Sequence, residues 1–171
     1  MKRVFALVLT LLLAVSLAAC GKKPAADAGK QVDLAAFAQS VTEAHEFSGF
    51  LQRVDLDDPD LGELMAQSMD NYYPGLVDLD LEQLEVYMSM ISFSSGELAL
   101  VQAKDADGAA AAMDILQARV AAKSTDGPGN YPGEVEMWLR NAKVTSNGNY
   151  VMMVCAEDSE AIVGEFDALF Q

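Results

Sequence analysis

The fold class of this chain is decided by the stretch Ala142-Lys143-Val144-Thr145-Ser146-Asn147-Gly148-Asn149-Tyr150-Val151-Met152-Met153-Val154-Cys155-Ala156. Two runs of strand composition, 142–146 and 150–156, flank the dipeptide Asn147-Gly148. Asn-Gly is the strongest short signal of a β-hairpin, because both residues tolerate the positive φ angles of a type I′ turn. The stretch therefore predicts an antiparallel strand pair.

A second strand pair is predicted upstream, where the runs 86–93 and 97–104 flank Ser94-Ser95-Gly96. Each predicted hairpin is followed by a segment with apolar residues on one helical face, 106–123 and 159–170. Further helices are predicted over 33–46, which Asp33 can cap, over 61–69 and over 133–140, and Asp80–Gln83 resembles a short capped turn.

The predicted fold is α+β: a mostly antiparallel, four-stranded sheet of two hairpins packed against helices, in the order α-α-β-β-α-α-β-β-α. Apolar residues occupy both faces of the strand 86–93, for example Met88 on one face and Tyr87 on the other. We therefore expect the sheet to be covered on both sides, with helices 33–46 and 61–70 as the second layer.

The N-terminus has the layout of a bacterial lipoprotein signal. Lys2 and Arg3 precede an apolar run of about 12 residues, against the roughly 20 that span a bilayer. Leu17-Ala18-Ala19-Cys20-Gly21 follows, with small residues ahead of one cysteine. The pattern predicts cleavage before Cys20, lipid on its thiol and a location on the extracytoplasmic face of the cell membrane. A plain secretory signal and an uncleaved anchor are the alternatives.

The predicted organisation is a signal peptide over 1–19, a lipid-anchored flexible tether over 20–32 and a single α+β domain over 33–171. Residues 21–32 show no apolar periodicity, and twelve such residues reach roughly 20 Å. The domain holds 25 acidic and six basic residues, so its net charge is −19. Such a surface repels phosphate backbones, and nucleic-acid binding is therefore not expected.

Five short motifs occur in a characteristic order. They are Tyr73-Pro74-Gly75-Leu76, Ser95-Gly96-Glu97, Lys104-Asp105, Asn130-Tyr131-Pro132 and Gly148-Asn149-Tyr150-Val151. Their order and spacing over 40–170 resemble a family of small lipoproteins from Gram-positive anaerobes, the domain of unknown function 4358. Gly133 and Cys155 depart from the pattern. The resemblance implies no established activity, ligand or catalytic residue.

Single residues with chemical potential have structural explanations. His45, the only histidine, lies near the end of a predicted helix, where the helix dipole favours a cation. Without further histidines, catalytic base systems of the Ser-His-Asp type depend on this one residue. Cys155 lies in an apolar strand, which predicts a buried and inert thiol. Methionine pairs such as Met152-Met153 favour core packing over Cu(I) binding.

An acidic cluster lies between the first two predicted helices, at Asp55, Asp57, Asp58 and Asp60. Carboxylates are ligands for Ca²⁺, but the EF-hand spacing fails because Pro59 occupies the third ligand position. The pattern favours a turn and helix cap.

Aromatic residues in a loop between the two halves form the candidate binding surface: Asn130, Tyr131, Pro132 and Trp138. Aromatic side chains supply contact area with little loss of entropy, although such a loop can also plug the core. The expected function is a non-catalytic binding or accessory module of the cell envelope. The alternatives are an envelope hydrolase that uses carboxylates and a calcium-binding lipoprotein. The expected partners are the membrane, through Cys20, and an envelope protein; no enzyme activity, cofactor or metal is expected.

Overall fold

The computed structural model describes residues 31–89, 91 and 94–171. The predicted signal peptide, Cys20 and the tether up to residue 30 lie outside the described residues. The same holds for residues 90, 92 and 93, at the end of the predicted strand 86–93. In the described part of the chain, no helix is long and apolar enough to cross a bilayer.

Ten elements follow one another along the described chain. They are α2 (Leu34–Ala44), β1 (Leu51–Arg53), α3 (Gly62–Tyr72), β2 (Leu81–Ser89), β3 (Glu97–Ala103), α4 (Ala106–Lys123), α5 (Pro132–Asn141), β4 (Lys143–Asn147), β5 (Tyr150–Cys155) and α6 (Ser159–Ala168).

The α+β class and the antiparallel sheet packed with helices are confirmed. The prediction of four strands is wrong, because the sheet has five strands in the order β1-β2-β3-β5-β4. The observed element order is α-β-α-β-β-α-α-β-β-α, and the additional strand is β1, between the first two helices. With three residues and one apolar side chain, β1 is too short to show the alternation that marks a strand in sequence.

Strand β2 begins at Leu81, within the segment where the sequence predicts a short capped turn. Leu81 pairs with Ala103 and Gln83 with Gln102, with a register shift between Leu81 and Gln83. The register shift is consistent with a β-bulge. Backbone pairing with β3 therefore overrides the turn preference of Asp80.

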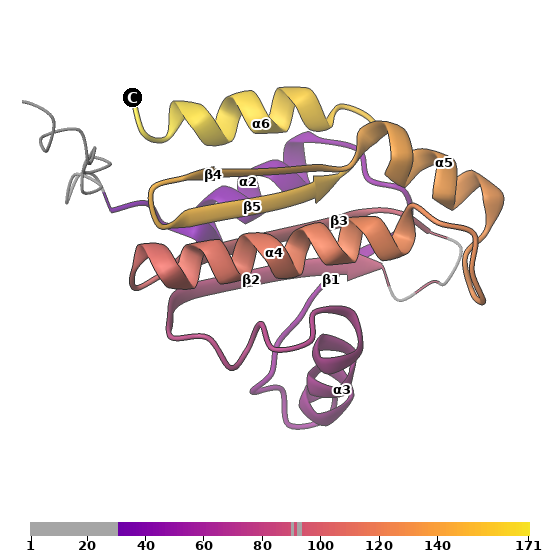
Figure 1. Ribbon diagram of the computed structural model, residues 1–171, viewed down its shortest axis with the longest axis horizontal. Coiled ribbons are helices and arrows are strands. Elements are labelled where there is room, and N and C mark those ends of the chain that lie inside the picture. The colour runs from indigo at the N-terminus through magenta and orange to yellow at the C-terminus, as the bar shows by residue number, and fades with distance from the viewer. Residues whose placement is uncertain (1–30, 90, 92–93) are drawn as a thin grey trace, which may run out of the picture.

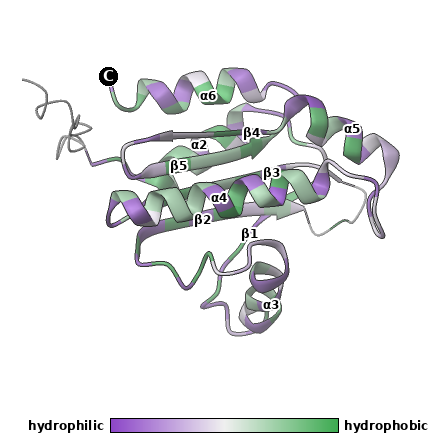
Figure 2. Ribbon diagram, in the orientation of Figure 1, coloured by the Kyte–Doolittle hydropathy of each residue, from purple (hydrophilic) through white to green (hydrophobic). Residues whose placement is uncertain are grey.

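Two hairpins join to form the centre of the sheet. In the β4–β5 hairpin, Asn147 pairs with Tyr150 and Gly148 has a φ of 57°, the left-handed region that the Asn-Gly signal requires. The β2–β3 hairpin joins it through antiparallel pairing of β3 with β5, which places Glu97 opposite Cys155. The central strands β3 and β5 are nearly continuously buried and hydrophobic (Figure 2).

Helices cover both faces of the sheet, as expected, but in a different grouping (Figure 1). Helices α2 and α6 pack on one face, where Phe37 and Phe166 contact Leu98 and its neighbours in one apolar cluster. Helices α3, α4 and α5 pack on the other face with Met69 and Leu116. The expectation that 33–46 and 61–70 form one layer is therefore wrong, because these helices lie on opposite faces.

The start of the described chain is bound to one end of the sheet. Val32 is buried, its N–H donates to the Tyr150 hydroxyl at 3.2 Å, and its carbonyl accepts from Gln83 Nε2 at 2.7 Å. The Leu34 N–H donates to Gln83 Oε1 at 2.9 Å. Tyr150 also packs on Phe170, with ring centroids 5.1 Å apart, so both ends of the described chain meet here (Figure 1). Val32, which the sequence places in the tether, thus packs against the folded part.

Candidate binding groove

A groove opens where α2 ends and the chain crosses to β1. Helix α2 ends at His45, and residues 46–50 connect it to the edge strand of the sheet. Gly49 has a φ of 82°, and a Cβ at this position would overlap the Ser94 side chain. Only glycine suits this conformation and this close approach, so Gly49 fixes the course of the connection.

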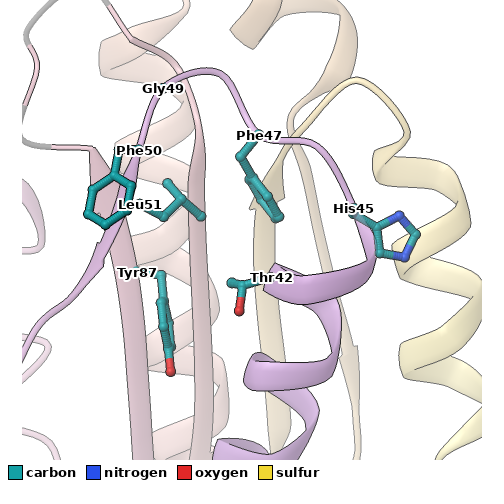
Figure 3. A pocket seen from close by; sticks show the side chains of 7 residues that line it. All are labelled: Thr42, His45, Phe47, Gly49, Phe50, Leu51 and Tyr87. Carbon is teal, nitrogen blue, oxygen red and sulfur yellow. The ribbon is translucent and has the colours of Figure 1, made fainter.

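The groove has a volume of about 380 Å³. Its lining residues come from the end of α2, the connection, β1 and β2: Thr42, His45, Phe47, Gly49, Phe50, Leu51 and Tyr87. Phe47, Leu51, Tyr87 and Thr42 lie around the space between α2 and the strands, and Phe50 lies at the rim (Figure 3). The lining is thus mainly aromatic and aliphatic, with one hydroxyl from α2 and one from β2.

The sheet register explains why this part of the sheet is partly open. Tyr87 lies opposite Leu98, and Leu98 belongs to the apolar cluster beneath α2 and α6. Leu51 lies on the same face, because it precedes Arg53, the partner of Tyr87, by two residues. The helices on this face cover Leu98 completely, whereas Leu51 and Tyr87 stay half-buried and Phe50 is 79% exposed.

An ion pair lies beside Tyr87. Arg53 donates from Nε and Nη2 to the two carboxylate oxygens of Glu85, at 2.8 and 2.9 Å. Hydrogen bonding to Glu85 raises the pKa of Arg53, so the guanidinium stays charged. Burial, followed by the charge of Glu85, raises the pKa of Tyr87, and its phenol is therefore neutral at physiological pH.

His45 lies at the opposite wall, and its ring turns away from the groove towards α6 (Figure 3). Nδ1 lies 2.6 Å from Asp158 Oδ2, and Nε2 lies 3.0 Å from Glu165 Oε1. Hydrogen bonding to Asp158 outweighs the effect of burial and, with Glu165, raises the pKa of His45. The histidine is at the helix end where the sequence places it, but its bridge to two carboxylates of α6 was not predicted.

The predicted aromatic surface is divided by the structure. Asn130 Nδ2 donates to the carbonyls of Ala122 and Thr125, at 3.1 and 2.7 Å, and so closes the loop after α4. Tyr131 caps the N-terminus of α5 and is 49% exposed, and Pro132 is in the first turn of that helix. Trp138 is 1% exposed and belongs to the core, so it does not lie on one surface with the other three.

Buried charged side chains surround Trp138. Arg119 donates to both carboxylate oxygens of Glu97, at 2.9 and 2.7 Å, and its guanidinium carbon lies 5.7 Å from the Trp138 ring centroid. Lys123 forms an ion pair with the fully buried Glu134 carboxylate. In the described residues, Trp138 Nε1 has no hydrogen-bond partner. This region is a paired charged core and not an open cleft.

The acidic cluster before α3 forms turn hydrogen bonds. Asp58 Oδ1 accepts from the N–H groups of Asp60 and Leu61, at 2.9 and 2.8 Å, and Asp55 Oδ1 accepts from the Asp57 N–H at 3.1 Å. These are the local bonds by which aspartate stabilises a turn. In the part of the chain that the structure describes, no group of three or more His, Cys, Asp or Glu is placed to hold a metal ion.

Cys155 and the methionine pair are core residues. Cys155 is fully buried, and burial raises the pKa of its thiol to about 12, as expected of an inert thiol. Met152 and Met153 alternate between the two sheet faces and pack in the two opposite core clusters.

The groove residues were not singled out from the sequence. A signal is present in Phe47-Ser48-Gly49-Phe50, where two aromatic residues flank a serine and a glycine directly after an amphipathic helix. What this segment faces depends on Tyr87, about 40 residues further along the chain, and only the folded chain brings the two together.

A comparison with curated proteins and a comparison with solved structures found no match. A sequence model of the family described as Domain of unknown function (DUF4358) matches residues 54–156. The match includes Tyr87 and strands β2 to β5, whereas α2, β1 and α6 lie outside it. Because the match covers more than half of its residues, the chain belongs to the family Domain of unknown function (DUF4358).

Proposed function

We propose that the protein is a lipid-anchored, non-catalytic binding module on the extracytoplasmic face of the cell membrane, and that it holds a partner protein in the groove. The N-terminal pattern ending at Cys20 supports the anchor. The earlier resemblance to lipoproteins of Gram-positive anaerobes is part of the same proposal.

The exposure of Phe50 is the observation that carries the binding role. This side chain is 79% exposed beside Phe47, Leu51 and Tyr87, and together they line one groove. An aromatic cluster that is concave and open to water is typical of the centre of a binding interface, where such residues contribute most of the affinity. A groove of this volume is also in the range of natural binding sites.

The position of the groove suits a membrane-anchored protein. The described chain begins at the first turn of α2, and the groove opens at its last turn. Eleven helical residues separate these points by about 16 Å. A lipid on Cys20 would thus hold one end of the molecule near the membrane and leave the groove at the other end of α2.

Fatty-acid labelling tests the anchor. Cells that produce the wild-type chain and grow with an alkyne fatty acid should yield a labelled protein in the membrane fraction. The variant Cys20→Ser should remain unlabelled and accumulate as a precursor or be shed. Equal labelling of both proteins would contradict the anchor.

Copurification tests the groove. Phe50→Ser and Leu139→Ser each replace one exposed apolar residue, 79% and 66% exposed, so the two changes should affect stability alike. We expect a protein that copurifies from detergent-solubilised membranes with the wild type and with Leu139→Ser, and at least tenfold less of it with Phe50→Ser. Equal recovery with both variants, or no associated protein with the wild type, would contradict the binding role.

A further inference from the structure

We propose that the groove takes an extended, basic segment of the partner protein, which pairs with β1 as a sixth strand and places an apolar side chain among Phe47, Phe50 and Tyr87. This inference rests on the proposed function and specifies its ligand. Addition of a strand to a free sheet edge is an established way for proteins to bind peptides, with main-chain bonds for affinity and a side-chain pocket for specificity.

Strand β1 is an edge of the sheet, and its pairing leaves two residues facing outward. The Val54 N–H donates to the Val86 carbonyl at 2.8 Å, so Val54 faces β2, and Gln52, two residues earlier, does the same. On the other side of β2, the Ser89 N–H donates to Gly96, so Ser89 faces β3 and not its partner Leu51. Both bonds lead to the same conclusion: the backbone groups of Leu51 and Arg53 point away from the sheet.

The same two residues direct their side chains to the groove face. Leu51 lines the groove, and Arg53 lies opposite Tyr87 on that face. A strand added to β1 would therefore bring every second side chain over the aromatic lining. Three residues of β1 offer only about 10 Å of pairing, so the groove must supply much of the affinity.

Charge favours a basic segment. The half-exposed carboxylates Asp158 and Glu165 lie behind His45, and Asp55 follows β1. The positive charge of Arg53 is already paired with Glu85. With a net charge of −19 over residues 33–171, the molecule attracts cationic partners and repels a second copy of itself.

Amide exchange with a defined probe tests this inference. The probe is the peptide acetyl-Lys-Phe-Lys-Val-Lys-amide, whose apolar residues share one face when it is extended. It is added to the full-length protein, purified from membranes in mild detergent. We expect the exchange of the Leu51 and Arg53 amides to slow at least tenfold, whereas Gln52 and Val54, paired in the free protein, should change little.

Three control peptides or variants accompany the probe. The same peptide with N-methyl groups on alternate residues keeps its side chains but cannot complete the ladder, and it should not slow exchange. A version with Glu in place of Lys should bind at least tenfold more weakly. Phe50→Ala should weaken the binding of the probe, whereas Leu139→Ala should not.

Each contrary outcome is distinct. If the probe binds and Phe50→Ala abolishes binding, but Leu51 and Arg53 stay unprotected, strand pairing is wrong while the groove function stands. Equal binding of the Lys and Glu peptides would overturn the basic character of the ligand. Protection of both amides without peptide, increasing with protein concentration, would assign the edge to a second copy and overturn the inference. A probe that does not bind at all would also overturn it, independently of the copurification result.

Discussion

Arg119 and Glu97 lie inside the molecule, with side chains 10% and 6% exposed. Their two hydrogen bonds form a bidentate pair, and the buried Tyr73 hydroxyl also donates to Glu97. Burial lowers the pKa of Arg119, but the charge of Glu97 more than offsets this effect, and the pKa of Arg119 is raised overall. Each charge is therefore tolerated in the core because the other is present.

Substitution of one partner should be more harmful than substitution of both. Arg119→Met leaves the Glu97 carboxylate buried without its countercharge, and we expect a loss of about 3–5 kcal/mol in the free energy of unfolding. The double variant Glu97→Leu/Arg119→Met removes both charges and should lose less. Urea denaturation measures both values, and a double variant less stable than Arg119→Met would contradict this account.

His45 makes part of the stability dependent on pH. Its pKa is raised in the folded protein, so its bonds to Asp158 and Glu165 contribute fully below its unfolded pKa of about 6.5. The contribution is lost as the pH rises through the folded pKa. Because both carboxylates are about half exposed, we expect only about 1 kcal/mol, measured as the difference in unfolding free energy between wild type and His45→Gln at pH 6 and pH 9.

The proton resonances of the single imidazole provide a direct control. Asp158→Asn keeps the size of the side chain but removes its charge, so it should lower the pKa of His45 measured by NMR titration. An unchanged pKa in this variant, or a stability difference that grows from pH 6 to pH 9, would contradict the bridge.

At the scale of elements, α4 shows how a single side chain sets a helix boundary. Asp105 precedes the helix, and its Oδ1 accepts a hydrogen bond from the Gly108 N–H at 2.8 Å. Asp107 lies in the first turn and is equally exposed. We expect Asp105→Ala to cost about 1 kcal/mol and Asp107→Ala about 0.3–0.5 kcal/mol in thermal unfolding. Equal losses would show that helix charge, and not the cap, stabilises this end.

Helix α5 separates an exposed aromatic residue from a buried one. Tyr131 caps the helix and is about half exposed, whereas Trp138 is 1% exposed among core residues. Trp138→Ala should therefore lower the unfolding free energy by about 3–5 kcal/mol, and Tyr131→Ala by about 1 kcal/mol or less. A loss of 3 kcal/mol or more in Tyr131→Ala would show that this side chain plugs the core.

Elements with a complete local signal are the ones that the sequence predicts. The Asn147-Gly148 turn and the helix beginning after Asp33 are confirmed, because turn chemistry and capping act between neighbouring residues. Strand β1 was missed because only its pairing with β2 makes it a strand. The beginning of β2 was missed for the same reason, since Asp80 favours a turn that the pairing of Leu81 overrides.

At the scale of the whole molecule, the sequence could not predict the groove. Its lining depends on α2 and α6 lying together on one face while β1 and β2 extend beyond them, and helical periodicity does not say which face a helix covers. The predicted surface around Tyr131 combined residues close in sequence, and Trp138 proved to be buried. The lipid on Cys20 stays a prediction of the N-terminal pattern.

The binding role of the groove is tested most directly by site-specific photocrosslinking in living cells. A benzophenone amino acid replaces Phe50 at the groove rim or, as a control, Leu139 on α5, both of which are well exposed. On irradiation we expect one discrete adduct with another protein from position 50 and none from position 139, and Tyr87→Ala should weaken the adduct. No adduct from position 50, or the same adduct from both positions, would contradict the account.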